Sequence, residues 1–113
     1  MIIQILKIIA GAATIITGLV SLFWPMKVPG FTGLEPAGGR GITEIRTILG
    51  ALFVGLGGAV IYFNSREAYL ILGITYLAMA LVRGISILVD KSPVSSNIIS
   101  FIAELIFGIL LVI

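Results

Sequence analysis

Charged side chains inside apolar segments are the residues of this chain that could do chemistry. Glu44 and Arg46 open a stretch that is otherwise almost wholly apolar, and Arg83 and Glu104 lie well inside two further apolar segments. An unpaired charge at the centre of a transmembrane helix costs at least about 2.5–3.5 kcal/mol on insertion scales. We therefore expect these four residues, with Asp90 at the end of the third segment, to form one cluster of paired charges near one membrane face.

The depth of two of these charges follows from their positions along the chain. Arg83 lies seven residues before Asp90, and Glu104 lies ten residues after Val94. Because a helix rises about 1.5 Å per residue, both side chains sit roughly 10–15 Å below the same face. The Arg83–Glu104 pair is therefore the one that we expect first.

Glu44 and Arg46 cannot pair with each other. Residues two apart point to opposite sides of a helix, so each needs its own neighbour. Arg40 could serve Glu44 as an i,i+4 partner if the helix begins that early. We therefore expect this second helix to connect the other helices of the protein.

Four long apolar segments must position these charges. Of the 113 residues, 59% are hydrophobic and 11% are charged, and each segment supplies about the 20 apolar residues that a membrane-spanning helix needs. Short turns between the last three segments favour antiparallel neighbours. The sequence predicts one all-α domain over residues 1–113, a four-transmembrane-helix antiparallel bundle whose helices run from Ile2 to Trp24, Ile42 to Phe63, Ala68 to Val89 and Val94 to Ile113.

The first segment has a second interpretation. Lys7 precedes an apolar run, as in a signal peptide. The run is long for a signal peptide, and no small-residue cleavage site separates it from its end at Trp24. We therefore favour a retained helix.

The segment from Pro25 to Arg40 predicts a long loop between the first two helices. It contains three prolines and four glycines, and it has no consistent hydrophobic period. Loops of this length are often functional, so a lid or a docking surface is one interpretation. We favour a crossover in the lipid headgroups, with Val28, Phe31 and Leu34 dipping into lipid.

Small residues recur at helical spacing in the first two helices. Such stripes let two membrane helices approach closely. They predict close packing of the first helix and of both sides of the second. The residues are Ala10, Thr14 and Gly18 in the first helix, Gly50 on the Arg46 side of the second, and Ala51, Gly55 and Ala59 on its Glu44 side.

The residue types that are absent exclude several kinds of site. The chain has no cysteine and no histidine, which excludes Cys/His zinc sites, iron–sulfur clusters, histidine-ligated haem and Ser-His catalysis. We expect no metal, no cofactor and no catalytic residue. The net charge of +2 comes from scattered residues, so we expect contact with membrane lipids and none with nucleic acid.

Several of these residues together resemble a known family. The pattern Glu-x-Arg-x-x-x-Gly in the second helix, an Arg in the third, an Asp and a Pro in the next turn and a Glu in the fourth is similar to an uncharacterised bacterial family of small four-helix membrane proteins. The resemblance implies the four-helix fold, a shared polar cluster and a place in the bacterial inner membrane, but no activity. The matching residues are Glu44, Arg46, Gly50, Arg83, Asp90, Pro93 and Glu104, and the chain departs from the family's pattern at Leu49, Ala51 and Lys91.

Three classes of function fit these residues. We expect a non-catalytic binding or accessory module, which binds a lipid, a small ligand or a partner membrane subunit, or associates as a homo-oligomer through its small-residue faces. The alternative is a small transporter or proton-conducting unit that uses Glu44, Arg83 and Glu104. A membrane enzyme with a carboxylate base ranks third. The same charges could instead serve only to fix the register of the helices.

Overall fold

The computed structural model describes the backbone of residues 1–113 and every side chain except that of Phe31. Four of its helical stretches, Ile2–Phe23, Gly38–Phe63, Arg66–Val89 and Ser95–Val112, are long and apolar enough to cross a membrane. The predicted all-helical fold with four membrane-length helices is confirmed, which supports a multi-pass integral membrane protein. The elements are α1 (Ile2–Phe23), η1 (Pro25–Lys27), α2 (Val28–Thr32), α3 (Gly38–Glu44), η2 (Ile45–Ala51), α4 (Leu52–Phe63), α5 (Arg66–Val89) and α6 (Ser95–Val112).

Local signals in the sequence set the tight turn between α4 and α5. Asn64 adopts a left-handed conformation, with φ of 44°, directly after α4, and asparagine tolerates this conformation better than most residues. Ser65 then caps α5, because its hydroxyl accepts a hydrogen bond from the Ala68 amide at 3.2 Å. The polypeptide therefore reverses direction within two residues.

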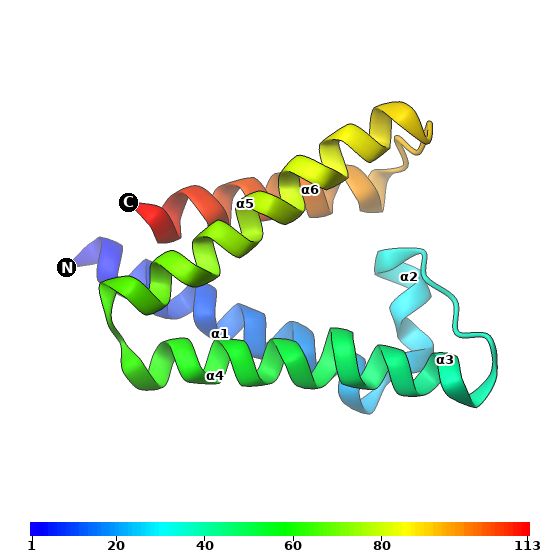
Figure 1. Ribbon diagram of the computed structural model, residues 1–113, viewed down its shortest axis with the longest axis horizontal. Helices are drawn as coiled ribbons and strands as arrows, with labels where there is room; N and C mark the ends of the chain where they lie inside the picture. The colour runs from blue at the N-terminus through cyan, green and yellow to red at the C-terminus, as the bar shows by residue number, and fades with distance from the viewer.

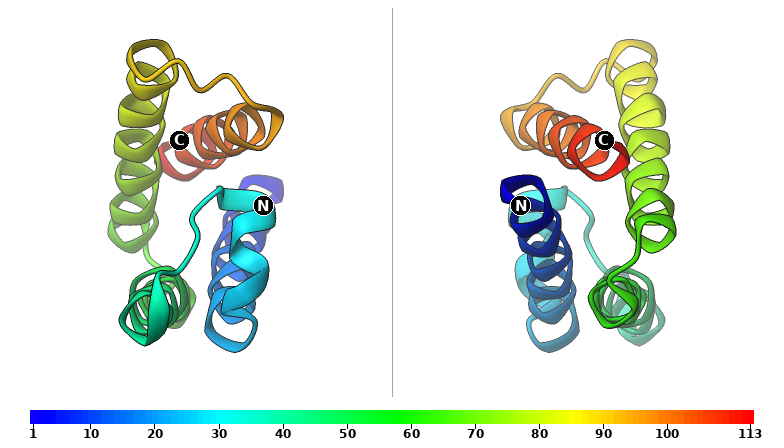
Figure 2. Two further views of the ribbon diagram at one scale, coloured as in Figure 1. Left: turned by 90° about the vertical axis from the view of Figure 1, so that its right-hand side faces the viewer. Right: turned by 90° about the vertical axis from the view of Figure 1, so that its left-hand side faces the viewer.

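The helices form two pairs. The α1 helix packs along η2 and α4, and α5 packs along α6, whereas α4 and α5 touch much less. The end views in Figure 2 show the two pairs as two layers. In Figure 1, α4 and α5 lie closest near the turn that joins them and diverge toward the other end of the molecule, where α2 stands. The second helix contacts α1 and α5, as expected of a connecting helix, but it packs closely only on α1.

Glycines allow the close contact between α1 and α4. A Cβ on Gly18 would lie 2.7 Å from the carbonyl oxygen of Gly50, and one on Gly57 would lie 2.8 Å from that of Gly11. Ala10 and Thr14 are also buried. The predicted packing role of Ala10, Thr14, Gly18 and Gly50 is confirmed.

The other side of the second helix does not pack as predicted. Ala51, Gly55 and Ala59 are exposed, and no atom lies within 4 Å of a Cβ built on Gly55. The physical reason is that α1 is the one close neighbour of this helix, since α5 turns away to pair with α6. The π-helical segment η2 also interrupts the α-helical period from which the stripe was counted.

The predicted loop is largely helical. Pro25 and Pro29 occupy the first turns of η1 and α2. Backbone N–H groups in a first turn have no partner within the helix, so the missing N–H of proline costs nothing there, and its fixed φ suits a helix. These prolines are therefore compatible with the starts of two short helices. The α3 helix begins at Gly38, four residues before the predicted start at Ile42.

The apolar side chains of this connection, which were predicted to dip into lipid, do not share one environment. Val28 is fully buried and lies in an element that contacts α6, so the expectation that it dips into lipid is wrong. Leu34 is exposed, and its contact with lipid stays a prediction. The expectation for the Phe31 side chain lies outside the described residues.

We predict that Gly18→Ala destabilises the contact between α1 and α4 by about 1–3 kcal/mol, because the new methyl would overlap backbone atoms of Gly50 and Val54. Gly55→Ala is the matched control. It meets open space and improves helix propensity, so it is expected to be neutral or to stabilise by up to about 1 kcal/mol. Unfolding in mixed micelles, followed by circular dichroism, measures both, and equal effects of the two variants would contradict the prediction.

Candidate functional site

A partly buried ion pair joins the C-terminal third of α5 to the middle of α6. The Nε of Arg83 donates to Oε1 of Glu104 at 2.8 Å, and its Nη2 donates to Oε2 at 2.9 Å. The Glu104 side chain is 7% exposed and that of Arg83 is 31% exposed. The predicted Arg83–Glu104 pair is confirmed, and its two parallel hydrogen bonds fix the orientation of the guanidinium.

Asn97 completes this arrangement. Its Oδ1 accepts a hydrogen bond from Nη1 of Arg83 at 2.8 Å, and its Nδ2 donates to the Ser92 carbonyl oxygen at 3.0 Å. Asn97 thus ties the guanidinium to the turn between α5 and α6. The spacing of Asn97, Ser100 and Glu104 along one face of α6 was the available signal for its role.

The structure does not bring the other predicted members into this cluster. Glu44 instead pairs with Arg40 at 3.1 Å on an exposed part of the surface. Arg46 is exposed and has no ion pair among the described side chains. The reason is that α3 and η2 belong to the other helix pair, and Ile45, which lies between Glu44 and Arg46, takes the buried position there.

Asp90 also remains outside the cluster. Its Oδ2 accepts a hydrogen bond from the Ser86 hydroxyl at 2.6 Å, one turn earlier on the same helix. Asp90 is exposed at the end of α5. It therefore contributes to the helix end, while Arg83 and Glu104 form the site.

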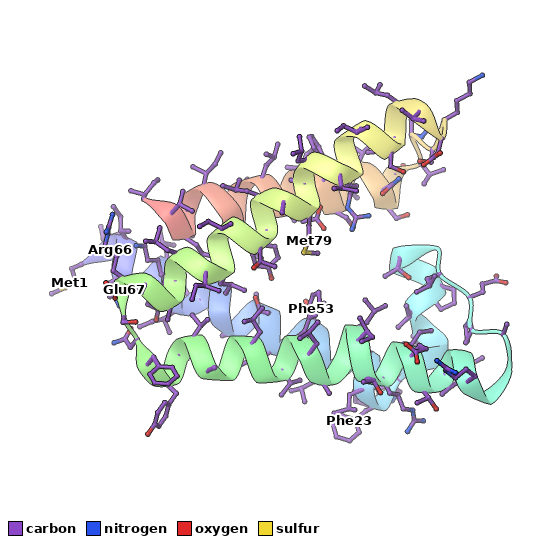
Figure 3. The ribbon with its side chains drawn as sticks, viewed as in Figure 1. Met1, Phe23, Phe53, Arg66, Glu67 and Met79 are labelled. Carbon is purple, nitrogen blue, oxygen red and sulfur yellow. The ribbon has the colours of Figure 1, made fainter. Side chains whose placement is uncertain are left out.

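A cleft of about 270 Å³ lies between the two helix pairs, and the ion pair forms part of its wall. Phe53 on α4 and Met79 on α5 point toward one another across the space between these helices (Figure 3). The wall has polar side chains on α1, α2, α5 and α6 and apolar ones on η2, α4, α5 and α6. The lining residues are Thr17, Ser21, Thr32, Leu49, Phe53, Tyr76, Met79, Arg83, Ile99, Ser100, Ala103, Glu104 and Phe107.

A smaller apolar pocket of about 110 Å³ adjoins the cleft between α4 and α5. Phe53, Tyr76 and Met79 line both spaces. The remaining lining residues of the pocket are Thr14, Leu52, Leu56, Leu72 and Thr75. The two spaces are therefore neighbours, one with a partly polar wall and one with an apolar wall.

Tyr76 stands at the boundary between the cleft and the pocket. Its hydroxyl lies 2.6 Å from Oγ1 of Thr14. Thr14 already donates its own proton to the Ala10 carbonyl at 2.8 Å, so Tyr76 donates and Thr14 accepts. The ring also packs edge to face on Phe107, with 5.5 Å between centroids, and these contacts hold it in place.

A buried lysine lies on the same side of α1 as Thr14 and Ser21. Lys7 is 8% exposed, and its Nζ lies 5.9 Å from the centroid of the Tyr69 ring, within the range of a cation–π contact. Sequence reasoning missed Lys7 as a member of a polar series. The available signal was the matching seven-residue spacing of Lys7, Thr14 and Ser21 on α1 and of Tyr69, Tyr76 and Arg83 on α5.

The chemistry of the site is that of binding through hydrogen bonds. Among the described residues no group of three or more acidic, histidine or cysteine side chains could hold a metal ion. Arg83 and Glu104 carry opposite charges and are already paired. The cleft therefore offers fixed hydrogen-bonding groups beside an apolar wall.

Comparison with known proteins gives one match. A model of the protein family described as Domain of unknown function (DUF4345) matches residues 2–113. No curated protein and no solved structure matches the chain. The resemblance to an uncharacterised family is thereby confirmed over almost the whole chain.

We predict that Glu104→Gln lowers the free energy of unfolding by about 3–5 kcal/mol, because it leaves the Arg83 charge without its buried partner. The double variant Arg83→Gln/Glu104→Gln is expected to lose less than the sum of the two single variants, since it removes both charges together. Glu44→Gln is the control, because its exposed ion pair contributes only about 0–1 kcal/mol. Unfolding in mixed micelles measures all four variants, and additive losses would contradict the pairing.

Proposed function

This chain belongs to the family described as Domain of unknown function (DUF4345), and we propose that it is a non-catalytic membrane module that binds one amphiphilic lipid. The observation that carries the proposal is the cleft between the helix pairs. It has a buried ion pair and hydroxyl groups on its wall, and it adjoins an apolar pocket. Such a gradient of polarity suits a molecule with a polar head and a hydrocarbon chain.

The polar part of the lipid would lie beside Arg83 and Glu104. Both oxygens of Glu104 accept hydrogen bonds from Arg83. The positive charge of Arg83 therefore balances the negative charge of the carboxylate, and the two hydrogen bonds fix the carboxylate's orientation. A carboxylate in this state is a poor general base, because a base must be within reach of a substrate proton with a suitable pKa. This arrangement favours binding over catalysis.

The apolar part of the lipid would lie between α4 and α5. Phe53 and Met79 line this space from opposite sides. Methionine is flexible and fills irregular apolar gaps, so this wall suits a hydrocarbon chain of variable length. The sparse contact between α4 and α5 favours entry from the side, directly from the membrane.

The proposed setting is an antiparallel bundle in the bacterial inner membrane. Both termini lie at one end of the molecule in Figure 1, which supports four crossings in alternating directions. The connection that contains α2 and the turn between α5 and α6 would then lie on the opposite face. In this setting the mouth of the cleft is within reach of the lipid headgroups on that face.

A second candidate function rests on the polar series across α1 and α5. Lys7 with Tyr69, Thr14 with Tyr76 and the Arg83–Glu104 pair follow one another at seven-residue intervals. A series of hydrogen-bonding groups through a membrane is a feature of proton relays. A small proton-conducting unit is therefore the alternative.

For lipid binding, we predict that Ala103→Phe lowers the occupancy of co-purified lipid by about tenfold, because the new ring would fill part of the cleft that Ala103 lines. Ala59→Phe makes the same change on the exposed face of α4 and is expected to leave occupancy unchanged. Native mass spectrometry of protein released from membranes reports bound lipid and oligomeric state together. A wild-type protein that carries no lipid, or equal occupancy in both variants, would contradict the proposal.

For the alternative, a proton-conducting unit is expected to acidify liposomes under an imposed pH gradient, and Glu104→Gln is expected to abolish this flux because it removes the titratable carboxylate. Glu44→Gln controls for loss of a carboxylate outside the cleft. A fluorescent pH indicator inside the vesicles provides the measurement. Wild-type vesicles that are no leakier than empty ones would exclude this candidate.

A further inference from the structure

The cleft has no net charge. Arg83 and Glu104 are the two charged residues among those that line it, and they neutralise each other. A ligand with a net charge would therefore bring an uncompensated charge into a site of low dielectric, which is costly. The charge balance of the cleft favours a head group that is neutral as a whole.

The wall formed by α1 and α2 offers acceptors and few donors. The hydroxyls of Thr17, Ser21 and Thr32 donate to the carbonyl oxygens four residues earlier, at 2.9, 3.3 and 2.8 Å. Each hydroxyl has one proton and two acceptor positions. With their protons committed to the backbone, Thr17 and Ser21 keep both acceptor positions for a ligand. Thr32 keeps one, because its Oγ1 also accepts a hydrogen bond from the Leu34 amide at 3.1 Å.

The facing wall offers donors. A guanidinium carries five N–H groups, and Arg83 uses one on Nε and one on Nη2 for Glu104 and one on Nη1 for Asn97. One N–H on each Nη atom remains. Ser100 on the same wall adds a hydroxyl that has no hydrogen bond among the described residues.

We infer that the cleft selects an amphiphile whose head group has no net charge and carries hydrogen-bond donors as well as acceptors. The donors face the hydroxyls of α1 and α2, and the acceptors face Arg83. A phosphoethanolamine head meets both conditions, because its ammonium donates and its phosphate accepts. A glycerol head meets them through its hydroxyls. This inference rests on the proposed function and specifies the ligand class for the same cleft.

Four lipids with oleoyl chains test the inference: monooleoylglycerol, dioleoylphosphatidylethanolamine, dioleoylphosphatidylcholine and dioleoylphosphatidic acid. The three phospholipids have no free glycerol hydroxyl, so they differ only in the head group. The choline head is neutral but cannot donate from its nitrogen, and phosphatidic acid carries a net negative charge. Each is titrated onto the full-length protein in mild detergent and followed by native mass spectrometry. We expect the first two lipids to bind about tenfold more tightly than the last two.

The outcomes separate this inference from the proposed function. If Ala103→Phe blocks every lipid but dioleoylphosphatidic acid binds as tightly as dioleoylphosphatidylethanolamine, the charge rule is overturned while the cleft remains the site. If the choline and ethanolamine lipids bind equally, the donor rule is overturned. If no lipid is sensitive to Ala103→Phe, the proposed function fails and the inference falls with it.

A variant of the acceptor wall tests the same inference. Thr17→Val keeps the side-chain shape but removes the hydroxyl that lines the cleft, so it is expected to reduce the preference for ethanolamine over choline by about threefold or more. Thr43→Val is the control, because the Thr43 hydroxyl makes the same kind of backbone hydrogen bond outside the cleft. Thr17→Ser should retain the preference. An unchanged preference in a folded Thr17→Val protein would overturn the role of this wall.

Discussion

The ion pair between Arg83 and Glu104 is the interaction on which the rest of the structure depends. In water such a pair would contribute little, but in hydrocarbon each charge alone would be costly. The pair therefore fixes the register of α5 against α6. Asn97 extends this restraint to the turn between the two helices. The result is a rigid half of the molecule that carries the polar wall of the cleft.

The other half is held together by shape. Glycines on α1 and α4 bring the two backbones close enough that an added Cβ would overlap a carbonyl oxygen, and membrane helices without a hydrophobic driving force associate through such contacts. The two halves share one core near the turn between α4 and α5, and they diverge beyond it. The core residues are Ala10, Val60, Tyr69, Leu72, Tyr76 and Leu111. The cleft is a consequence of this divergence.

Much of the fold could be predicted from the sequence, because the length of an apolar segment directly reflects the thickness of a bilayer. The Arg83–Glu104 pair was predictable for a related reason, since both residues lie inside apolar helices joined by a short turn. The wider cluster of charges that the sequence predicts does not form. Glu44 and Arg46 lie near the start of a helix where exposed positions remain, so nothing forces them inward. The hydrophobic pattern also does not show which helices pair, so the open space beside Gly55 and the helical start at Val28 could not be predicted from the sequence alone.

The hydrogen bonds from the hydroxyls of α1 to its own backbone also bear on how the protein enters a membrane. Thr14 and Thr17 donate their protons within the helix, and Lys7, the charged residue of α1, lies less than two turns from its start, where a long side chain can reach the interface. The α1 helix can therefore insert before any other helix is present. The α5 and α6 helices differ, because each carries a charge whose partner lies on the other. The few residues between them allow both helices to enter together as a hairpin, with the charges already paired. Of the four membrane-length helices, α1 would then be able to insert alone, whereas α5 and α6 would have to insert as a pair.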